Sequence, residues 1–185
     1  MAVQLKRRLF TVEEYYKMAE IGILTPESKV ELINGEIIRM RPSKSEHANA
    51  IDLLTRELIL AIQKRAIVRV QNPISIDNHS EPEPDIAIVR TKEEDNYRHH
   101  HPVAKDILLI IEVSDSSLNF DREVKTPLYA EAGIPEYWII NLQDQQVEIY
   151  KNLVRGQYSN RRIFFAEDQL TLEAFDWSLP IAELF

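Results

Sequence analysis

Hydrophobic residues recur at helical spacing in three segments of this chain, and these segments are predicted to form helices. The longest covers residues 43–65, with Ser43 or Ser45 as its N-terminal cap. Its apolar residues fall on one helix face, at Ile51, Leu54, Leu58, Ala61 and Ile62. A first helix should begin after Thr11, where "TVEE" has the form of a capping box, and a third is expected over about 120–132.

Shorter apolar runs, alternating or continuous, predict the strands of a sheet. They are expected at residues 29–33, 36–41, 66–71, 74–76, 85–89, 106–114, 136–142 and 146–150, with shorter strands in 157–185. Asn34-Gly35 suits the two-residue turn of a hairpin, because both positions need a positive φ. The nearly continuous apolar run at 107–111 is typical of a central strand covered on both faces. The segment that follows it is long enough for a parallel crossover.

The order of these elements predicts an α/β (α+β) fold, in which a mixed β-sheet is flanked by helices. The chain has 185 residues, of which 44% are hydrophobic, and no Gly- or Ser-rich linker divides it. These properties predict a single domain over residues 1–185. The N-terminal residues lack the apolar segment of a signal peptide, and no apolar run approaches the roughly 20 residues of a membrane helix. We therefore expect a cytoplasmic protein without a membrane span.

Composition excludes some chemistry and weighs against one class of partner. The chain has no cysteine, which excludes disulfides, thiolate zinc sites and cysteine nucleophiles. Its 22 basic and 30 acidic residues give a net charge of −8, whereas proteins that coat duplex DNA without specificity are usually basic. If this protein binds nucleic acid, it must use a local basic patch or a metal that neutralises its carboxylates.

Two carboxylates stand at the ends of predicted apolar strands. Asp85 opens the run "DIAIV", and Glu112 nearly closes the run "ILLIIEVS". A buried charge without a partner is costly, so these groups need water, a cation or a hydrogen-bond donor. If the strands are neighbours, the carboxylates form a hard oxygen site for Mg²⁺ or Mn²⁺, with the Val113 carbonyl as a further ligand. Capped or salt-bridged acidic residues are also common at strand ends, so the residues alone leave both interpretations open.

Four segments together resemble the Uma-two family of restriction endonucleases, within the PD-(D/E)xK nuclease superfamily: "KVELINGEIIRM", "EPEPDIAIVR", "ILLIIEVSDSS" and "FDREVKTPLYAEAGIPEYWIINL". The resemblance extends from about residue 10 to 152. It implies a restriction-endonuclease-like core, with Asp85 as the aspartate of the motif and Glu112 as its acidic partner. It also implies that Glu31 is a further glutamate of the site. The family often has a histidine near His47, which is either a peripheral site residue or an exposed residue at a helix start.

The lysine of the superfamily motif usually follows the acidic partner by two residues, and this chain has Ser114 there. Lys125 resembles a relocated lysine. Asp121, Lys125 and Tyr129 follow one another at intervals of four and would share one helix face. Pro127 either bends this helix or begins it, and in the second case Lys125 lies just outside. A surface ion pair between Asp121 and Lys125 is the alternative interpretation.

The resemblance implies a metal-dependent DNA endonuclease that hydrolyses phosphodiester bonds. Asp85, Glu112 and the Val113 carbonyl would hold Mg²⁺ (or Mn²⁺), and Glu31 would bind a second ion or a metal-bound water. Lys125 would orient the attacking water or stabilise developing negative charge. DNA is then the expected substrate, and a homodimer is expected by analogy with enzymes that cut two strands. The alternative is a catalytically inactive module that keeps the nuclease fold for binding or assembly.

Overall fold

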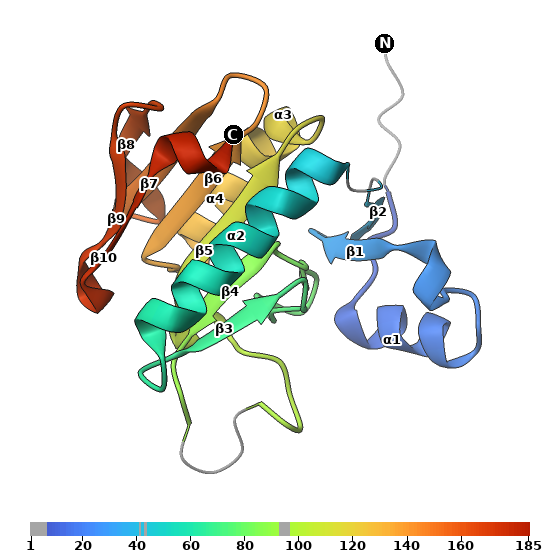
Figure 1. Cartoon of the computed structure of the whole chain (residues 1–185). Coiled ribbons are helices and arrows are strands. Elements are labelled where there is room, and N and C mark those ends of the chain that lie inside the picture. The colour runs from blue at the N-terminus through green and yellow to red at the C-terminus, as the bar shows by residue number, and fades with distance from the viewer. Residues whose placement is uncertain (1–6, 41, 43, 93–96) are drawn as a thin grey trace.

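The computed structural model describes residues 7–40, 42, 44–92 and 97–185, and its centre is a mixed sheet of six strands (Figure 1). The strands lie in the order β3-β4-β5-β6-β7-β8. Their bounds are Ile67–Val70 (β3), Ile86–Val89 (β4), Ile107–Ser114 (β5), Glu136–Asn141 (β6), Gln146–Val154 (β7) and Gln157–Phe164 (β8). Strands β5 and β6 run parallel, whereas the other neighbouring pairs are antiparallel. The predicted parallel crossover is therefore confirmed.

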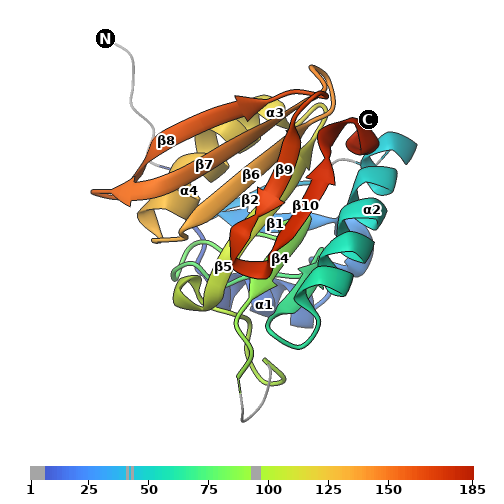
Figure 2. The same ribbon diagram turned by 60° about the vertical axis from the view of Figure 1, so that its left-hand side comes forward.

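Helix α2 covers one face of the sheet, together with strands β9 and β10 from the C-terminal part of the chain (Figure 2). The bounds of these elements are Ser45–Ile62 (α2), Gln169–Leu172 (β9) and Trp177–Pro180 (β10), with short 3-10 turns at Glu173–Phe175 and Ile181–Leu184. Leu54 and Leu58 of α2 are fully buried here, which contributes about 1.5–3 kcal/mol each. Trp177 of β10 stacks on Trp138 of β6, with ring centroids 6.5 Å apart.

A continuous helical segment covers the other face of the sheet. It comprises α3, a π-helical turn and α4, with bounds Leu118–Phe120, Asp121–Lys125 and Thr126–Glu131. Leu128 and Tyr129 of α4 are buried in one cluster with Tyr137 of β6, and the two tyrosine rings meet edge to face at 5.1 Å. Strand β5 is thus covered on both faces, as its continuous apolar run predicts.

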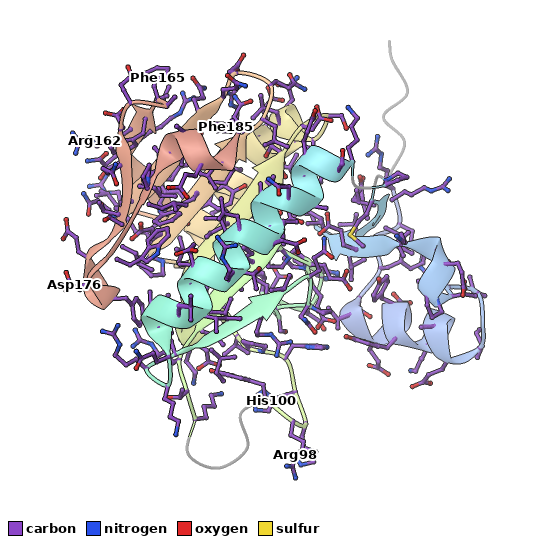
Figure 3. All side chains as sticks on the ribbon, viewed as in Figure 1. Arg98, His100, Arg162, Phe165, Asp176 and Phe185 are labelled. Atoms are coloured by element: carbon purple, nitrogen blue, oxygen red, sulfur yellow. The ribbon has the colours of Figure 1, made fainter. Side chains whose placement is uncertain are left out.

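Helix α1 and the hairpin β1–β2 form a projection beside this layered body, which we call the arm (Figure 1; Figure 3 shows it with its side chains). Its elements are Val12–Glu20 (α1), a 3-10 turn at Pro26–Ser28, Val30–Ile33 (β1) and Glu36–Arg39 (β2). Thr11 caps α1 through the predicted capping box. Asn34 and Gly35 form the predicted turn, with φ of 50° and 75°. The arm is fastened to the segment before β4, where the Glu81 N–H donates to the Leu32 carbonyl at 2.8 Å.

The strand predicted at residues 74–76 is not formed. Ser75 makes only an isolated bridge with Val103. The N–H of the buried Ile74 bonds the carbonyl of Pro82 instead of a sheet neighbour. Pro73, directly before this segment, has no N–H to offer to a ladder. The segment therefore serves as a packed connection between β3 and β4.

The ends of α2 also differ from the prediction. The helix ends at Ile62 because Gln63 adopts a positive φ of 53°, which a continuing helix does not allow. Its N-cap is Lys44 and not Ser45, whereas Ser43 lies outside the described residues. Neither α2 nor any other helix in the described ranges is long and apolar enough to cross a membrane.

Candidate active site

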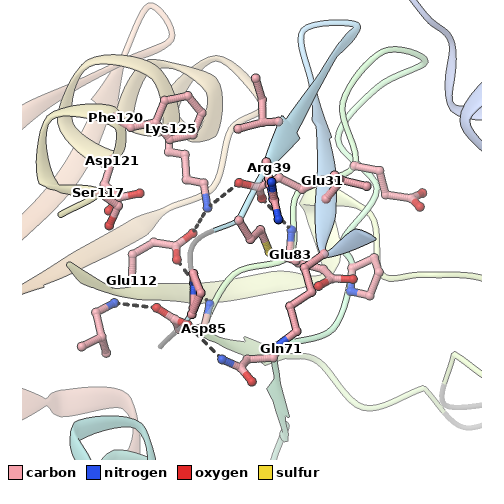
Figure 4. A pocket seen from close by; sticks show the side chains of 18 of the residues that line it. Glu31, Arg39, Gln71, Glu83, Asp85, Glu112, Ser117, Phe120, Asp121 and Lys125 are labelled. Atoms are coloured by element: carbon pink, nitrogen blue, oxygen red, sulfur yellow. Dashed lines mark hydrogen bonds and ion pairs between the residues drawn. The ribbon is translucent and has the colours of Figure 1, made fainter. Parts of the chain in front are cut away.

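A cleft of about 960 Å³ lies between the arm and the end of the sheet at which β5 finishes (Figure 4). The four residues predicted as catalytic all line it: Glu31, Asp85, Glu112 and Lys125. Glu31 belongs to β1, Asp85 immediately precedes β4, Glu112 lies on β5, and Lys125 ends the π-helical turn. The tertiary structure thus brings together side chains from four separate parts of the chain.

Asp85 and Glu112 lie side by side because β4 and β5 are antiparallel. Ile86 pairs with Ile111, which places Asp85, one residue earlier, opposite Glu112. The Asp85 N–H donates to Oε2 of Glu112 at 3.3 Å, and the Val113 N–H donates to Oδ2 of Asp85 at 2.9 Å. The two carboxylates therefore share one corner of the cleft.

Lys125 reaches the same corner from the helical face of the sheet. Its Nζ lies 3.0 Å from Oε1 of Glu112 and 3.3 Å from Oε1 of Glu31, and the lysine side chain is only 7% exposed. The Tyr129 hydroxyl donates to the same Glu112 oxygen at 3.0 Å. One oxygen of Glu112 is thus held by two donors, and the other faces Asp85.

The alternative interpretation, a surface pair between Asp121 and Lys125, is wrong. Both residues are buried, and Oδ2 of Asp121 accepts a hydrogen bond from the Ser114 hydroxyl at 2.7 Å. Lys125 and Thr126, the two residues before Pro127, both have helical backbone angles, so the helical segment neither begins at the proline nor leaves Lys125 outside it. The N–H that Pro127 lacks falls at the junction of the π-helical turn and α4. The π-helical turn directly before Pro127 ends at Lys125 and is a type of turn that is frequent at functional sites.

Burial dominates the electrostatics of this corner. It raises the pKa of Glu112 to about 8; the Lys125 ammonium opposes this rise, and neighbouring negative charges reinforce it. Burial alone would lower the pKa of Lys125, but the charges of Glu112 and Glu31 outweigh it and hold that pKa above its ordinary value. Several carboxylates face one ammonium, so an additional cation would stabilise the ionised form of the site.

The oxygen atoms of this corner are of the kind that Mg²⁺ binds. Oε1 of Glu112 is bonded to Lys125, whereas Oε2 faces Asp85 and is left with one long hydrogen bond. No group of three or more His, Cys, Asp or Glu residues in the described chain could hold a metal ion. Two carboxylates and a backbone carbonyl, such as that of Val113, are nevertheless a usual set for Mg²⁺, which keeps several waters and takes oxygens from substrate phosphates.

Glu31 lies on the other side of Lys125 from Glu112 (Figure 4). Its Oε1 contacts Lys125, and its Oε2 accepts a hydrogen bond from the Glu83 N–H at 3.1 Å. Glu31 is also buried. In this arrangement Glu31 fixes the position of the lysine. Its expected role, binding a second ion or a metal-bound water, stays a prediction.

Three further residues contact the site, and sequence patterns indicate only some of them. Nε2 of His47, near the start of α2, lies 3.3 Å from Oδ2 of Asp85, and this hydrogen bond raises the histidine pKa although burial opposes it. Tyr129 was marked by its helical spacing from Lys125. Gln71 places Nε2 3.4 Å from Oδ1 of Asp85, but no local pattern marks it, because it reaches Asp85 only through the pairing of β3 with β4.

The sheet, its flanking helices and the acidic corner define a protein with a restriction-endonuclease-like fold. The crystal structure of a "putative nuclease belonging to DUF820" from Anabaena variabilis ATCC 29413 shares this fold, with a TM-score of 0.76 and 17% sequence identity over 95% of this chain and 97% of that chain. The model of the Uma2 family, described as "Putative restriction endonuclease", matches residues 12–182. The chain belongs to this Uma-two family, as its sequence motifs predict. No curated protein matches the chain.

Proposed function

We propose that this protein is a metal-dependent endonuclease that hydrolyses phosphodiester bonds in DNA. The observation that carries the proposal is the division of the Glu112 carboxylate, with Lys125 on one oxygen and Asp85 beside the other. This arrangement supports a cation and an ammonium acting on the same reacting group. The family and the fold, both of the nuclease type, support a nucleic-acid substrate, and DNA is the substrate that the family description favours.

The residues of the corner have separate roles in this proposal. Asp85, Glu112 and the Val113 carbonyl would hold Mg²⁺ or Mn²⁺, which supplies a bound water of lowered pKa and offsets charge on the phosphate. Lys125 lies where it can orient the attacking water or stabilise negative charge that develops on the phosphoryl oxygens. Glu31 and the Tyr129 hydroxyl keep Lys125 and the glutamate in place through the contacts described above. Glu31, Glu112 and Lys125 are buried, so solvent screens the interactions between their charges only weakly.

The experiment is a cleavage assay on supercoiled plasmid with Mg²⁺ or Mn²⁺. The unaltered protein should nick the plasmid, and Asp85→Ala and Glu112→Gln should nearly abolish nicking. Asp52→Ala is the matched control, because Asp52 is an exposed carboxylate on α2 that does not line the cleft. Equal nicking by the unaltered protein and the Asp85→Ala variant would refute the mechanism.

A thermal-shift titration separates catalysis from the alternative function as a binding module. An ion that binds the native state raises the melting temperature as its concentration rises. We expect this shift with Mn²⁺ for the unaltered protein and none for Asp85→Ala. A shift without any cleavage would instead favour a module that retains the fold and binds metal without chemistry.

A further inference from the structure

The cleft is lined by more negative than positive side chains. Its seven acidic residues are Glu31, Glu81, Glu83, Asp85, Glu112, Asp115 and Asp121. Its four basic residues are Lys29, Arg39, Lys44 and Lys125. Counted as formal charges with His47 neutral, seven against four leaves an excess of three negative charges, which disfavours a polyanion. A nucleic acid therefore needs specific cationic contacts at the rim to enter.

Two of the four basic residues are already engaged within the protein. Lys125 is buried among carboxylates, and Lys44 forms an ion pair with Asp115 at 2.6 Å. Lys29 and Arg39 differ, because both are exposed and neither side chain has an ion-pair partner within the described residues. These two cations are available to an external anion.

Lys29 and Arg39 are neighbours at the open end of the arm hairpin. The Met40 N–H donates to the Lys29 carbonyl at 2.8 Å, and Arg39 pairs with Val30 in the hairpin register. Glu31 follows Lys29 by two residues and reaches inward to Lys125. Arg39 lies on the same side of the cleft as Glu31 (Figure 4). The hairpin thus contributes one residue to the interior of the site and two cations to its rim.

We propose that Lys29 and Arg39 bind backbone phosphates of the nucleic-acid strand whose phosphodiester lies at Asp85 and Glu112. This inference rests on the proposed function and adds the residues that hold the DNA strand at the cleft. The guanidinium of Arg39 offers planar donors that match phosphate oxygens, and Lys29 offers a mobile point charge. Contacts of this kind set the position of the strand and carry no sequence information.

The test measures binding of a fluorescein-labelled DNA duplex by anisotropy, in the inactive Glu112→Gln background with Mg²⁺. Adding Lys29→Gln and Arg39→Gln together should weaken binding roughly hundredfold, because each lost charged contact should weaken it about tenfold. The dependence of log affinity on log salt should flatten by about two. The control pair is Lys64→Gln with Lys105→Gln, which removes the same charge from exposed residues that do not line the cleft.

A second measurement compares DNA with the small diester bis(p-nitrophenyl) phosphate, with Glu112 intact. Lys29→Gln/Arg39→Gln should lose cleavage of DNA through a raised KM and keep its turnover of the small diester. A protein that merely unfolds would lose both activities. If an acidic peptide displaces the labelled DNA in the binding assay at the same concentration as unlabelled DNA does, the rim serves a protein partner. That result would overturn the inference.

The two levels of the proposal fail in different ways. If the Lys29→Gln/Arg39→Gln variant binds and cleaves DNA to the same extent as the unaltered protein, the inference about the rim is wrong and the proposed function stands. Equal weakening by the rim pair and the control pair would also refute the inference, because it would show only a general charge effect. If the unaltered protein neither cleaves DNA nor turns over the small diester, the proposed function fails.

Discussion

The ammonium of Lys125 lies 3.0 Å from Oε1 of Glu112, although the lysine ends a π-helical turn and the glutamate belongs to a central strand. Both side chains are buried, so each depends on the other for compensation of its charge. This contact joins the helical face of the sheet to the acidic corner, so a change there is expected to affect both the stability of the fold and the proposed catalysis.

Replacing Lys125 with Met should damage both properties. Loss of the buried Lys125 ammonium should destabilise the fold by about 3–5 kcal/mol, because its carboxylate partners lose their compensation. Loss of a charge-stabilising donor should lower the nicking rate about 10²–10³-fold. Urea unfolding and the plasmid assay check both values. In the double variant Lys125→Met/Glu112→Gln, stability should partly return while cleavage stays absent. If the two changes instead lower the stability additively, the two side chains do not stabilise each other.

Tyr129→Phe should affect catalysis more than folding. The change removes one hydrogen bond to Glu112, worth about 1 kcal/mol, and keeps the buried ring. A glutamate that is less well oriented should bind the ion more weakly, so the Mg²⁺ concentration for half-maximal cleavage should rise about 10–100-fold. Tyr137→Phe is the matched control, because its buried hydroxyl has no hydrogen-bond partner among the described residues. The same Mg²⁺ requirement in both variants would count against a positioning role for Tyr129.

Gly35→Ala should disturb the arm and the site together. A Cβ at Gly35 would lie 2.6 Å from the Cβ of Leu9, and the residue also has a φ of +75°. Gly22→Ala carries only the backbone penalty of about 1–2 kcal/mol, because nothing lies within 4 Å of its added Cβ at a similar φ of +78°. Gly35→Ala should cost about 1–3 kcal/mol more and should lower nicking, because Glu31 lies on the same hairpin. Similar losses of stability in the two variants, measured in urea, would argue against the clash.

Glu148 of β7 should contribute stability that disappears in acid. Burial alone would raise the pKa of this fully buried carboxylate, but hydrogen bonds from Arg122 and Tyr150 and the charge of Arg161 outweigh it and lower the pKa below its ordinary value of 4.5. A lowered pKa in the folded state gives stability that is present above pH 4.5 and lost as the pH falls through the folded-state pKa.

Glu148→Gln should therefore cost about 1–2 kcal/mol at neutral pH, and this difference from the unaltered protein should shrink as the pH falls below 4.5. Urea unfolding at several pH values provides the measurement. Glu123→Gln is the control, because Glu123 is an exposed carboxylate on the same helical segment as Arg122. A cost that does not change with pH would show that the charge of Glu148 is not what stabilises it.

Much of the fold could be predicted because it follows from interactions between residues close in sequence. The capping box at Thr11, the turn at Asn34-Gly35 and the apolar run of β5 depend on a few consecutive positions. The wrong prediction of a strand at residues 74–76 has both a local and a longer-range cause. Residues 74–76 have strand-like composition, but the preceding proline and the packing of Ile74 against the segment before β4 direct their backbone elsewhere.

The amino-acid sequence by itself determined most of the order of the elements, apart from the strand expected at residues 74–76, and it carries the motifs of the family. The resemblance to that family implied the four candidate catalytic residues. Only the tertiary structure decided that Lys125 faces inward between Glu31 and Glu112, and that Gln71 reaches Asp85. The physical reason is that these contacts join positions far apart in the chain. Their geometry depends on strand register, on the π-helical turn and on the packing of the arm, none of which a local pattern of residues specifies.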